Sequence, residues 1–305
     1  MSAVAPRSFL HVTDLSADEL RTVLALAEAP IASLGRPLDG LGAALIFEKP
    51  SNRTRQSTEM AVVQLGGHPV YTRGDEVGFD VRETVEDVTR IMAGYHALLA
   101  ARVFDHGVLE RMAAVSSVPV LNMLSNRSHP LQAVADVLTM QQHFGDLAGR
   151  VVAFVGDYNN VARSLAEASL LLGMHVRLGC PAGYDAADAE LARLDAIGSG
   201  SIEQSSDPAV AVKGAHVVHT DTWTSMGQES EKARRAEVFG RYQVNESLLS
   251  GASSDAVFMH CMPAYRGLEV AADVFDGPRS LAFQQGHNRM HAARGVIAFL
   301  VGVRP

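Results

Sequence analysis

The sequence predicts an α/β protein built from two parallel-sheet domains, with an active-site cleft between the domains. Apolar, strand-like runs alternate with amphipathic helical patterns along nearly the whole chain, which is typical of parallel sheets covered by helices. A glycine-containing break at 145–149 separates two such sets, and a length of 305 residues suits two domains. We therefore expect domains over 1–144 and 145–286.

The first alternating set begins with a helix. Ser16 and Glu19 have the spacing of a capping box, which predicts a helix that continues through Leu26. Pro130 suits the first turn of a long helix that runs to about His143. Between these helices we expect strands at 42–47, 68–72, 97–103 and 118–122, and helices at 53–65 and 83–94.

The second set begins with a strand at 151–155. Further strands are expected near 174–179, 215–219 and 256–260. A final helix is expected from about His287 to Val301. Because chain termini often return to close a two-domain structure, we expect the segment 287–305 to pack back on the first domain.

Composition narrows the function classes. A net charge of −8 argues against nucleic acid or an anionic membrane as the partner of the whole surface. The only cysteines, Cys180 and Cys261, are too few for a disulfide scaffold and suit a reducing compartment. The N-terminus lacks the apolar core of a signal peptide, and no run approaches the roughly 20 apolar residues that span a bilayer. We expect a soluble cytoplasmic protein.

The strongest local signal is an anion-binding turn at 51–55. This Ser-Asn-Arg-Thr-Arg segment lies between the strand at 42–47 and the helix at 53–65. Free backbone N–H groups and the helix dipole favour an anion at such a turn, and the arginine guanidinium matches phosphate oxygens. A solvated basic turn is the alternative interpretation of this segment alone.

Polar side chains follow the strand at 118–122 as well. His129 and Gln132 are three residues apart at a helix start, so both side chains can point to one spot. Histidine can donate to a carbonyl oxygen, and the glutamine oxygen can accept from an amide. A histidine that satisfies backbone groups at the helix start is the simpler alternative.

The second set carries its own candidates at strand ends, where ligands collect in α/β sheets. The turn at 157–160 lacks the glycine fingerprint of dinucleotide sites, so nicotinamide binding is disfavoured. Asp221 follows the next strand and can pair with a substrate ammonium, whereas Trp223 is expected to pack. Cys261 follows the last strand, where a nucleophile, a metal ligand and an inert core residue remain open. A zinc site is not expected, because the cysteines and histidines lack paired spacing.

In combination and in this order, the motifs resemble the aspartate/ornithine carbamoyltransferase family along the whole chain. The resemblance rests on the segments 47–55, 64–67, 129–132, 157–160, 221–227 and 260–263. It implies an N-terminal domain that binds carbamoyl phosphate, a C-terminal domain that binds the amino acid, and a homotrimer or a multiple of trimers. The Ser225-Met226-Gly227 and His260-Cys261-Met262-Pro263 segments favour L-ornithine over aspartate.

The resemblance also assigns residue roles. It implies that carbamoyl phosphate is bound by Ser51, Asn52, Arg53, Thr54, Arg102, His129, Gln132 and Arg289. It implies that ornithine is bound by Asn160, Asp221, Ser225, Met226 and Cys261. Arg102, His129, Cys261 and Arg289 are the expected catalytic residues. Family members extend a loop residue into a neighbouring subunit's site, and Arg73 and Arg82 are the candidates here.

The implied reaction transfers the carbamoyl group to the ornithine δ-amine and gives L-citrulline and phosphate, as in arginine biosynthesis. It requires donors that stabilise the developing oxyanion, and we expect neither a metal nor another cofactor. Two alternatives remain. One is a carbamoyltransferase for another amine, such as an acylated ornithine or putrescine; the other is a non-catalytic homologue.

Overall fold

The computed structural model describes residues 6–224 and 229–304. The chain divides into two compact units. Residues up to Ala135, together with the segment from Asn288, form the first unit, and Asp136–His287 form the second. The division falls within two helices, α6 (Pro130–Phe144) and α13 (Ala282–Leu300), so each of them contributes residues to both units.

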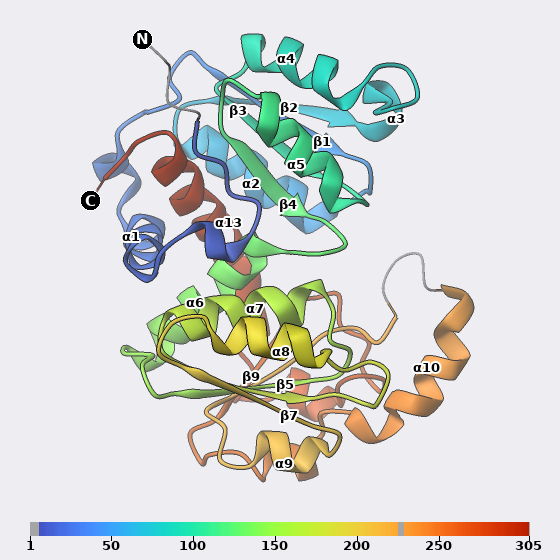
Figure 1. The fold of residues 1–305 in the computed structure, drawn as a ribbon. Coiled ribbons are helices and arrows are strands. Elements are labelled where there is room, and N and C mark those ends of the chain that lie inside the picture. The colour runs from blue at the N-terminus through green and yellow to red at the C-terminus, as the bar shows by residue number, and fades with distance from the viewer. Residues whose placement is uncertain (1–5, 225–228, 305) are drawn as a thin grey trace. The chain divides into compact units, whose positions relative to one another are not determined.

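The first unit contains a four-stranded parallel sheet in the order β2-β1-β3-β4 (Figure 1). Its strands are β1 (Gly42–Phe47), β2 (His68–Arg73), β3 (Leu98–Arg102) and β4 (Val120–Leu124). Its helices, besides its parts of α6 and α13, are η1 (Val12–Asp14), α1 (Ala17–Glu28), η2 (Ile31–Leu34), α2 (Asn52–Gln64), α3 (Gly74–Val77), α4 (Val85–Tyr95) and α5 (His106–Val115). The strand segments are continuous apolar runs because they are buried. Strand β1 is buried from Ala43 to Phe47, and β3 is buried over its whole length.

The second unit contains a five-stranded parallel sheet in the order β7-β6-β5-β8-β9. Its strands are β5 (Val151–Val155), β6 (His175–Gly179), β7 (Ser201–Ser205), β8 (Val217–Thr220) and β9 (Val257–His260). Its further helices are α7 (Asn160–Leu171), α8 (Asp188–Asp195), α9 (Pro208–Val212), η3 (Glu229–Glu231), α10 (Lys232–Phe239), η4 (Gly240–Tyr242), α11 (Glu246–Leu249) and α12 (Ala272–Phe275). The predicted α/β fold class, with two parallel sheets, is confirmed.

Each sheet has a point where the strand order reverses. In the first unit, β1 lies between β2 and β3, and the chain leaves β1 and β3 toward opposite sides of the sheet order. In the second unit, β5 and β8 are the corresponding pair. Ligands of open α/β sheets bind beyond the carboxyl ends of strands at such points. The segments that follow β1, β3, β5 and β8 are therefore the expected ligand-binding positions.

Helices α1 and α13 pack closely within the first unit. The Arg294 guanidinium on α13 donates to Ala27 O at 2.6 Å. Gly295 faces α1 so closely that an added Cβ atom would lie 2.6 Å from Val23 O and 2.8 Å from Ala27 N. The start of α13 differs from the sequence-based expectation of His287. The helix begins at Ala282, and Gln285 N already donates to Leu281 O at 2.8 Å.

Within the described residues, none of the helices combines the length and the apolar character that crossing a membrane requires.

Candidate active site

Two arginines from distant parts of the chain meet at one hydroxyl in the first unit. Arg102, the last residue of β3, donates from Nη1 to Thr54 Oγ1 at 3.3 Å. Arg289 on α13 donates from Nη2 to the same oxygen at 3.0 Å. These two bonds occupy both lone pairs of the Thr54 hydroxyl, so its O–H is left to act as a donor. All three side chains are buried.

Arg102 brings a buried positive charge into this cluster. Burial, and then the neighbouring Arg289, lower the pKa of the Arg102 guanidinium to about 10, so it still carries a charge at neutral pH. Within the described residues, Arg102 Nε is buried and has no hydrogen-bond partner. A buried donor without a partner costs about 1–3 kcal/mol or more when it belongs to a charged group. An anion that accepts from Arg102 Nε would remove this cost, and its negative charge would balance the buried guanidinium.

His129 and Gln132 lie beside the two arginines. Gln132 Oε1 accepts from Arg289 Nη1 at 2.6 Å, which orients the amide with its oxygen toward the guanidinium. Burial, Arg289 and Arg102, in that order, hold the pKa of the His129 imidazole well below its ordinary value. The imidazole is therefore neutral at physiological pH. A neutral imidazole can donate one hydrogen bond to a carbonyl oxygen without adding a third positive charge.

The N-terminus of α2 completes this cluster. Ser51 is the N-cap residue, but its side chain makes no capping hydrogen bond. Arg53 is exposed, and its guanidinium forms no hydrogen bond or ion pair within the described part of the chain. Arg55 points elsewhere, because it pairs with Glu59 at 2.8 Å and stacks over the Tyr71 ring at 3.8 Å. Of the two arginines in the turn, Arg53 is therefore the one available to an anion.

The loop after β2 is tied to its own unit. Arg111 forms ion pairs with Asp80 and Glu86, both at 2.6 Å. Arg73 pairs with Asp75, and the Arg82 guanidinium donates to a backbone oxygen at 3.3 Å. Neither Arg73 nor Arg82 belongs to the Thr54 cluster in the structure. Their expected contribution to a neighbouring subunit stays a prediction.

A second polar cluster lies at the ends of β5, β8 and β9 in the second unit. Asp221 follows β8 and accepts from Asn159 Nδ2 at 2.8 Å and from the Thr222 N–H at 2.7 Å. Cys261 follows β9, and its thiol donates to Asp221 Oδ1 at 2.9 Å. Asn159 also caps α7, because its side-chain oxygen accepts from the Val161 and Ala162 N–H groups. The Asp221 carboxylate is thus held in place by three donors, with Asn160 at the adjoining helix start.

Buried polar contacts support the second cluster. Arg235 on α10 pairs with Asp157 at 2.7 Å and donates to Trp223 O at 2.9 Å. Burial raises the pKa of the Asp157 carboxyl, and the hydrogen bond from Arg235 opposes this shift. Trp223 is 5% exposed and stacks on Phe239, so it packs, as expected. These contacts hold the segment from Asp221 to Trp223.

The loop that carries Cys261 is constrained by its neighbours. His260 Nδ1 accepts from the Met262 N–H at 2.9 Å, so His260 Nε2 carries the proton and donates to Glu269 at 3.2 Å. Met262 has φ of +55°, which a residue with a Cβ atom rarely adopts. Backbone strain of this kind persists only where the surroundings enforce it.

The structure thus brings together most of the side chains singled out in the sequence, in two sets. One set contains Thr54, Arg102, His129, Gln132 and Arg289, with Ser51, Asn52 and Arg53 at the adjoining helix start. The other contains Asp221 and Cys261, with Asn160 next to the capping residue Asn159. Ser225 and Met226 lie outside the described residues.

Sequence reasoning missed several residues of the site. It did not identify Asn159 as the partner of Asp221, nor Arg235 and Glu269 as supports. The Asn159 role had a weak signal, since an Asn directly before a helix predicts a cap. Arg235 and Glu269 had no such signal. Arg235 contacts Asp157, which is 78 residues away, and Glu269 contacts His260, which is 9 residues away, so neither pair has a regular helix or strand spacing.

The chain matches two family models that together cover most of its length. Residues 7–142 match the carbamoyl-P binding domain of aspartate/ornithine carbamoyltransferase, and residues 148–300 match its Asp/Orn binding domain. The first match contains the Thr54 cluster except Arg289, and the second contains Asp221, Cys261 and Arg289.

Individual relatives agree with the family models. An ornithine carbamoyltransferase from Thermus thermophilus is 44% identical over 298 residues, which is 97% of each chain. The solved structure of ornithine carbamoyltransferase from Pyrococcus furiosus is 40% identical, covers 100% of each chain and superposes with a TM-score of 0.92. A solved N-acetyl-L-ornithine transcarbamylase mutant is more distant, with 31% identity and a TM-score of 0.86 over 96% of this chain and 99% of that one.

Proposed function

Because the chain belongs to the aspartate/ornithine carbamoyltransferase family, we propose that it transfers the carbamoyl group of carbamoyl phosphate to the δ-amine of L-ornithine. The products are L-citrulline and phosphate. The observation that carries the proposal is the shared hydrogen bonding of Arg102 and Arg289 to Thr54, beside His129 and Gln132. This arrangement offers several donors to one small anion and one acceptor to its amide.

We assign carbamoyl phosphate to the first unit, with Ser51, Asn52, Arg53 and Thr54 at its phosphate. The α2 N-terminus supplies backbone N–H groups, Thr54 supplies its O–H, and Arg53 supplies a guanidinium that no other side chain of residues 6–224 and 229–304 holds. Phosphate is the leaving group of the reaction, so donors already placed around it stabilise the charge that it gains. The domain division follows from this assignment: 1–144 with 287–305 for carbamoyl phosphate, and 145–286 for ornithine.

The carbamoyl carbonyl is assigned to Arg102, His129 and Arg289. Attack by the amine converts the carbonyl oxygen into an oxyanion, which these three donors stabilise more strongly than they stabilise the ground state. Gln132 accepts from the carbamoyl amide, because its oxygen is the atom turned toward the cluster. The new bond forms between the δ-nitrogen and the carbonyl carbon, and the bond from that carbon to the phosphate oxygen breaks.

Ornithine is assigned to the second unit. Asp221 supplies a carboxylate for the α-ammonium group, and Asn160, Ser225 and Met226 bind the amino acid end. The δ-amine must lose a proton before it attacks, because its ordinary pKa is near 10, like that of lysine. Cys261 is placed near that amine as a hydrogen-bonding partner. No covalent enzyme intermediate is part of the proposal, and the departing phosphate accepts the proton that the attacking nitrogen releases.

We further propose a homotrimer in the cytoplasm that acts in the biosynthetic direction. Exposed apolar side chains on neighbouring elements of the first unit, Met60 and Val63 on α2 and Val70 on β2, support assembly. A relative from Pyrococcus furiosus named as the anabolic ornithine carbamoyltransferase, 41% identical over 98% of each chain, supports the direction. Two cysteines without a disulfide are in keeping with a reducing compartment.

The test is formation of a ureido product from carbamoyl phosphate with ornithine, N-acetylornithine, putrescine, lysine and aspartate in parallel. Turnover confined to ornithine is the expected result. Turnover confined to N-acetylornithine or putrescine would reassign the amine. Carbamoyl phosphate binding without turnover of any amine would favour a non-catalytic homologue.

A further inference from the structure

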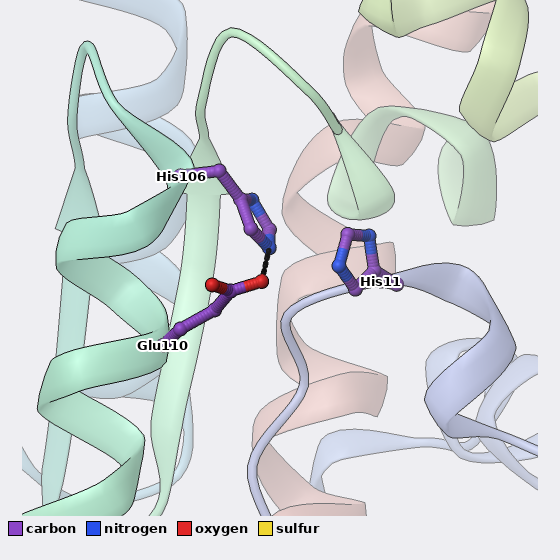
Figure 2. A group of neighbouring side chains, drawn as sticks. All are labelled: His11, His106 and Glu110. Carbon is purple, nitrogen blue, oxygen red and sulfur yellow. Dashed lines mark ion pairs between the residues drawn. The ribbon is translucent and has the colours of Figure 1, made fainter.

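Three metal-ligating side chains gather in the first unit away from the Thr54 cluster. They are His11, which precedes η1, and His106 and Glu110, which lie on α5. One ligand atom from each lies within 4.8 Å of the other two. Figure 2 shows His106 and Glu110 turned toward each other from α5, with the His11 ring facing them from the N-terminal segment.

We propose that His11, His106 and Glu110 bind a divalent transition-metal ion of the Zn²⁺ type. The ligand set has two imidazoles and one carboxylate, which suits such ions and leaves a fourth, water-filled position in a tetrahedral site. Zn–N and Zn–O bonds of about 2.0–2.2 Å place ligand atoms about 3.4 Å apart. The His106 Nε2 to Glu110 Oε1 distance is 3.9 Å, so a small rotation of the exposed Glu110 closes that side.

The helix supplies two ligands with the correct spacing. His106 and Glu110 are four residues apart, so their side chains project from the same face of α5. His106 is 3% exposed, which limits its rotation. A helical pair of this kind forms a chelate on a rigid element. The third ligand, His11, comes from a segment 95 residues earlier. The centroids of the His11 and His106 rings lie 4.2 Å apart.

The other ring nitrogen of His106 has the partner that a metal-bound histidine requires. His106 Nδ1 lies 2.7 Å from Ser125 Oγ. When Nδ1 carries the proton and donates to this hydroxyl, the Ser125 O–H is left to donate to Ser128 O, at 3.4 Å. Nε2 then presents its lone pair toward Glu110 and His11. Such an outer partner fixes both the tautomer and the ring orientation of a ligating histidine. No sequence spacing predicted this site, because it joins residues that only the fold brings together.

A bound ion would link three segments of the first unit. The Arg127 and Ser128 N–H groups lie 3.3 and 3.2 Å from Ser125 Oγ and share its second lone pair when His106 Nδ1–H occupies the first. Ser128 directly precedes His129 of the Thr54 cluster. The ion would therefore tie the N-terminal segment to α5 and, through Ser125, to the turn that leads into the active site. This predicts that metal binding raises thermal stability.

The first test is a Co²⁺ titration of chelator-treated protein, followed by visible absorption and calorimetry. Co²⁺ bound at the proposed site shows d–d bands without cobalt–thiolate charge transfer. This distinguishes it from the Asp221, His260 and Cys261 group of the second unit, whose thiolate would produce that charge transfer. His11→Ala and Glu110→Gln should each weaken Co²⁺ affinity by about tenfold or more. His68→Ala, an exposed histidine of the same unit, should leave affinity unchanged.

The second readout is the midpoint of thermal unfolding with and without Zn²⁺. Because a ligand that binds only the folded state raises this midpoint, Zn²⁺ should stabilise the unmodified protein and His68→Ala more than His11→Ala. Unmodified Co²⁺ affinity in both His11→Ala and Glu110→Gln would overturn the proposal. A spectrum that shows only thiolate-bound cobalt, absent after Cys261→Ser, would overturn it as well.

Discussion

The Arg289 guanidinium donates to the Thr54 hydroxyl at 3.0 Å, although 235 residues separate the two in the sequence. Thr54 lies in the first turn of α2, and Arg289 lies on α13, which the chain reaches only after it has formed the second unit. Because Arg102 donates to the same oxygen, the threonine hydroxyl holds two cations in place by one atom. Those two bonds fix the direction in which the Thr54 O–H can donate.

Replacing Thr54 by valine should weaken carbamoyl phosphate binding. The change keeps the shape but removes the acceptor of two guanidinium groups and one donor to the ligand, which corresponds to about 1.5–3 kcal/mol for hydrogen bonds to charged groups. Calorimetry should show affinity lower by about tenfold or more. Thr58→Val is the matched control, because Thr58 lies one turn along α2 with a buried hydroxyl that has no hydrogen-bond partner within the described residues. Equal affinities for the two variants would contradict the role of Thr54.

The two arginines of the 51–55 turn should differ in function. Arg53→Gln is expected to reduce carbamoyl phosphate affinity strongly, because Arg53 is exposed beside the α2 N-terminus and its guanidinium has no partner in the described structure. Arg55→Gln should have a small effect, since Arg55 is already engaged by Glu59 and Tyr71. Both changes remove one positive charge, so general electrostatics cancel in the comparison. A larger loss in Arg55→Gln would reverse the assignment.

Asp221→Asn should raise the KM for ornithine far more than the KM for carbamoyl phosphate. The variant removes the negative charge that we assign to the α-ammonium group. Steady-state kinetics with each substrate varied in turn provide the measurement. Similar increases for both substrates would contradict the division of binding between the two units.

Cys261→Ser should retain measurable turnover. A serine hydroxyl can also donate to Asp221 Oδ1, as the thiol does at 2.9 Å, and the proposed reaction contains no covalent step at this residue. Initial-rate assays on folded protein test this point. Complete loss of turnover in a variant that still binds both substrates would indicate that the thiol acts as a nucleophile.

His129 predicts a stability change with pH. Its pKa is lowered by burial and by two arginines, so between that lowered value and its ordinary pKa of about 6.5 the unfolded chain binds the extra proton. Stability should therefore fall as pH decreases below about 6.5, with no contribution from His129 above that pH. His129→Gln should show a smaller decrease in unfolding midpoint between pH 7.5 and pH 5.5 than the unmodified protein. Identical decreases would show that His129 does not contribute to this acid sensitivity.

The sequence predicted most of the strands and several helices, because their signals are local, but it did not predict β7 (Ser201–Ser205). Buried parallel strands such as 42–47 and 151–155 are continuous apolar runs, and Ser16 with Glu19 forms the capping box that its spacing predicts. The expected start of α13 near His287 was wrong, because the helix begins at Ala282 and Gly286 lies inside it. Its position inside the helix is a tertiary effect, since Met262 packs where a Cβ atom would lie.

The site was predictable as a set of residues but not as an arrangement. Strand ends and the family resemblance identified Thr54, Arg102 and Arg289, whereas their meeting at one oxygen depends on the path of the whole chain. The Arg235 to Asp157 ion pair, across 78 residues, and the His11 contact with His106 had no local signal either. Long-range polar contacts follow from the fold, and no sequence period encodes them.

The most direct test of carbamoyl transfer follows ¹³C-labelled carbamoyl phosphate by NMR in the presence of enzyme and ornithine. The label should move to the ureido carbon of citrulline, with one phosphate released for each label transferred and no phosphate release above background without ornithine. Ornithine-independent phosphate release, or label that stays in carbamoyl phosphate while ornithine is bound, would contradict the proposed reaction.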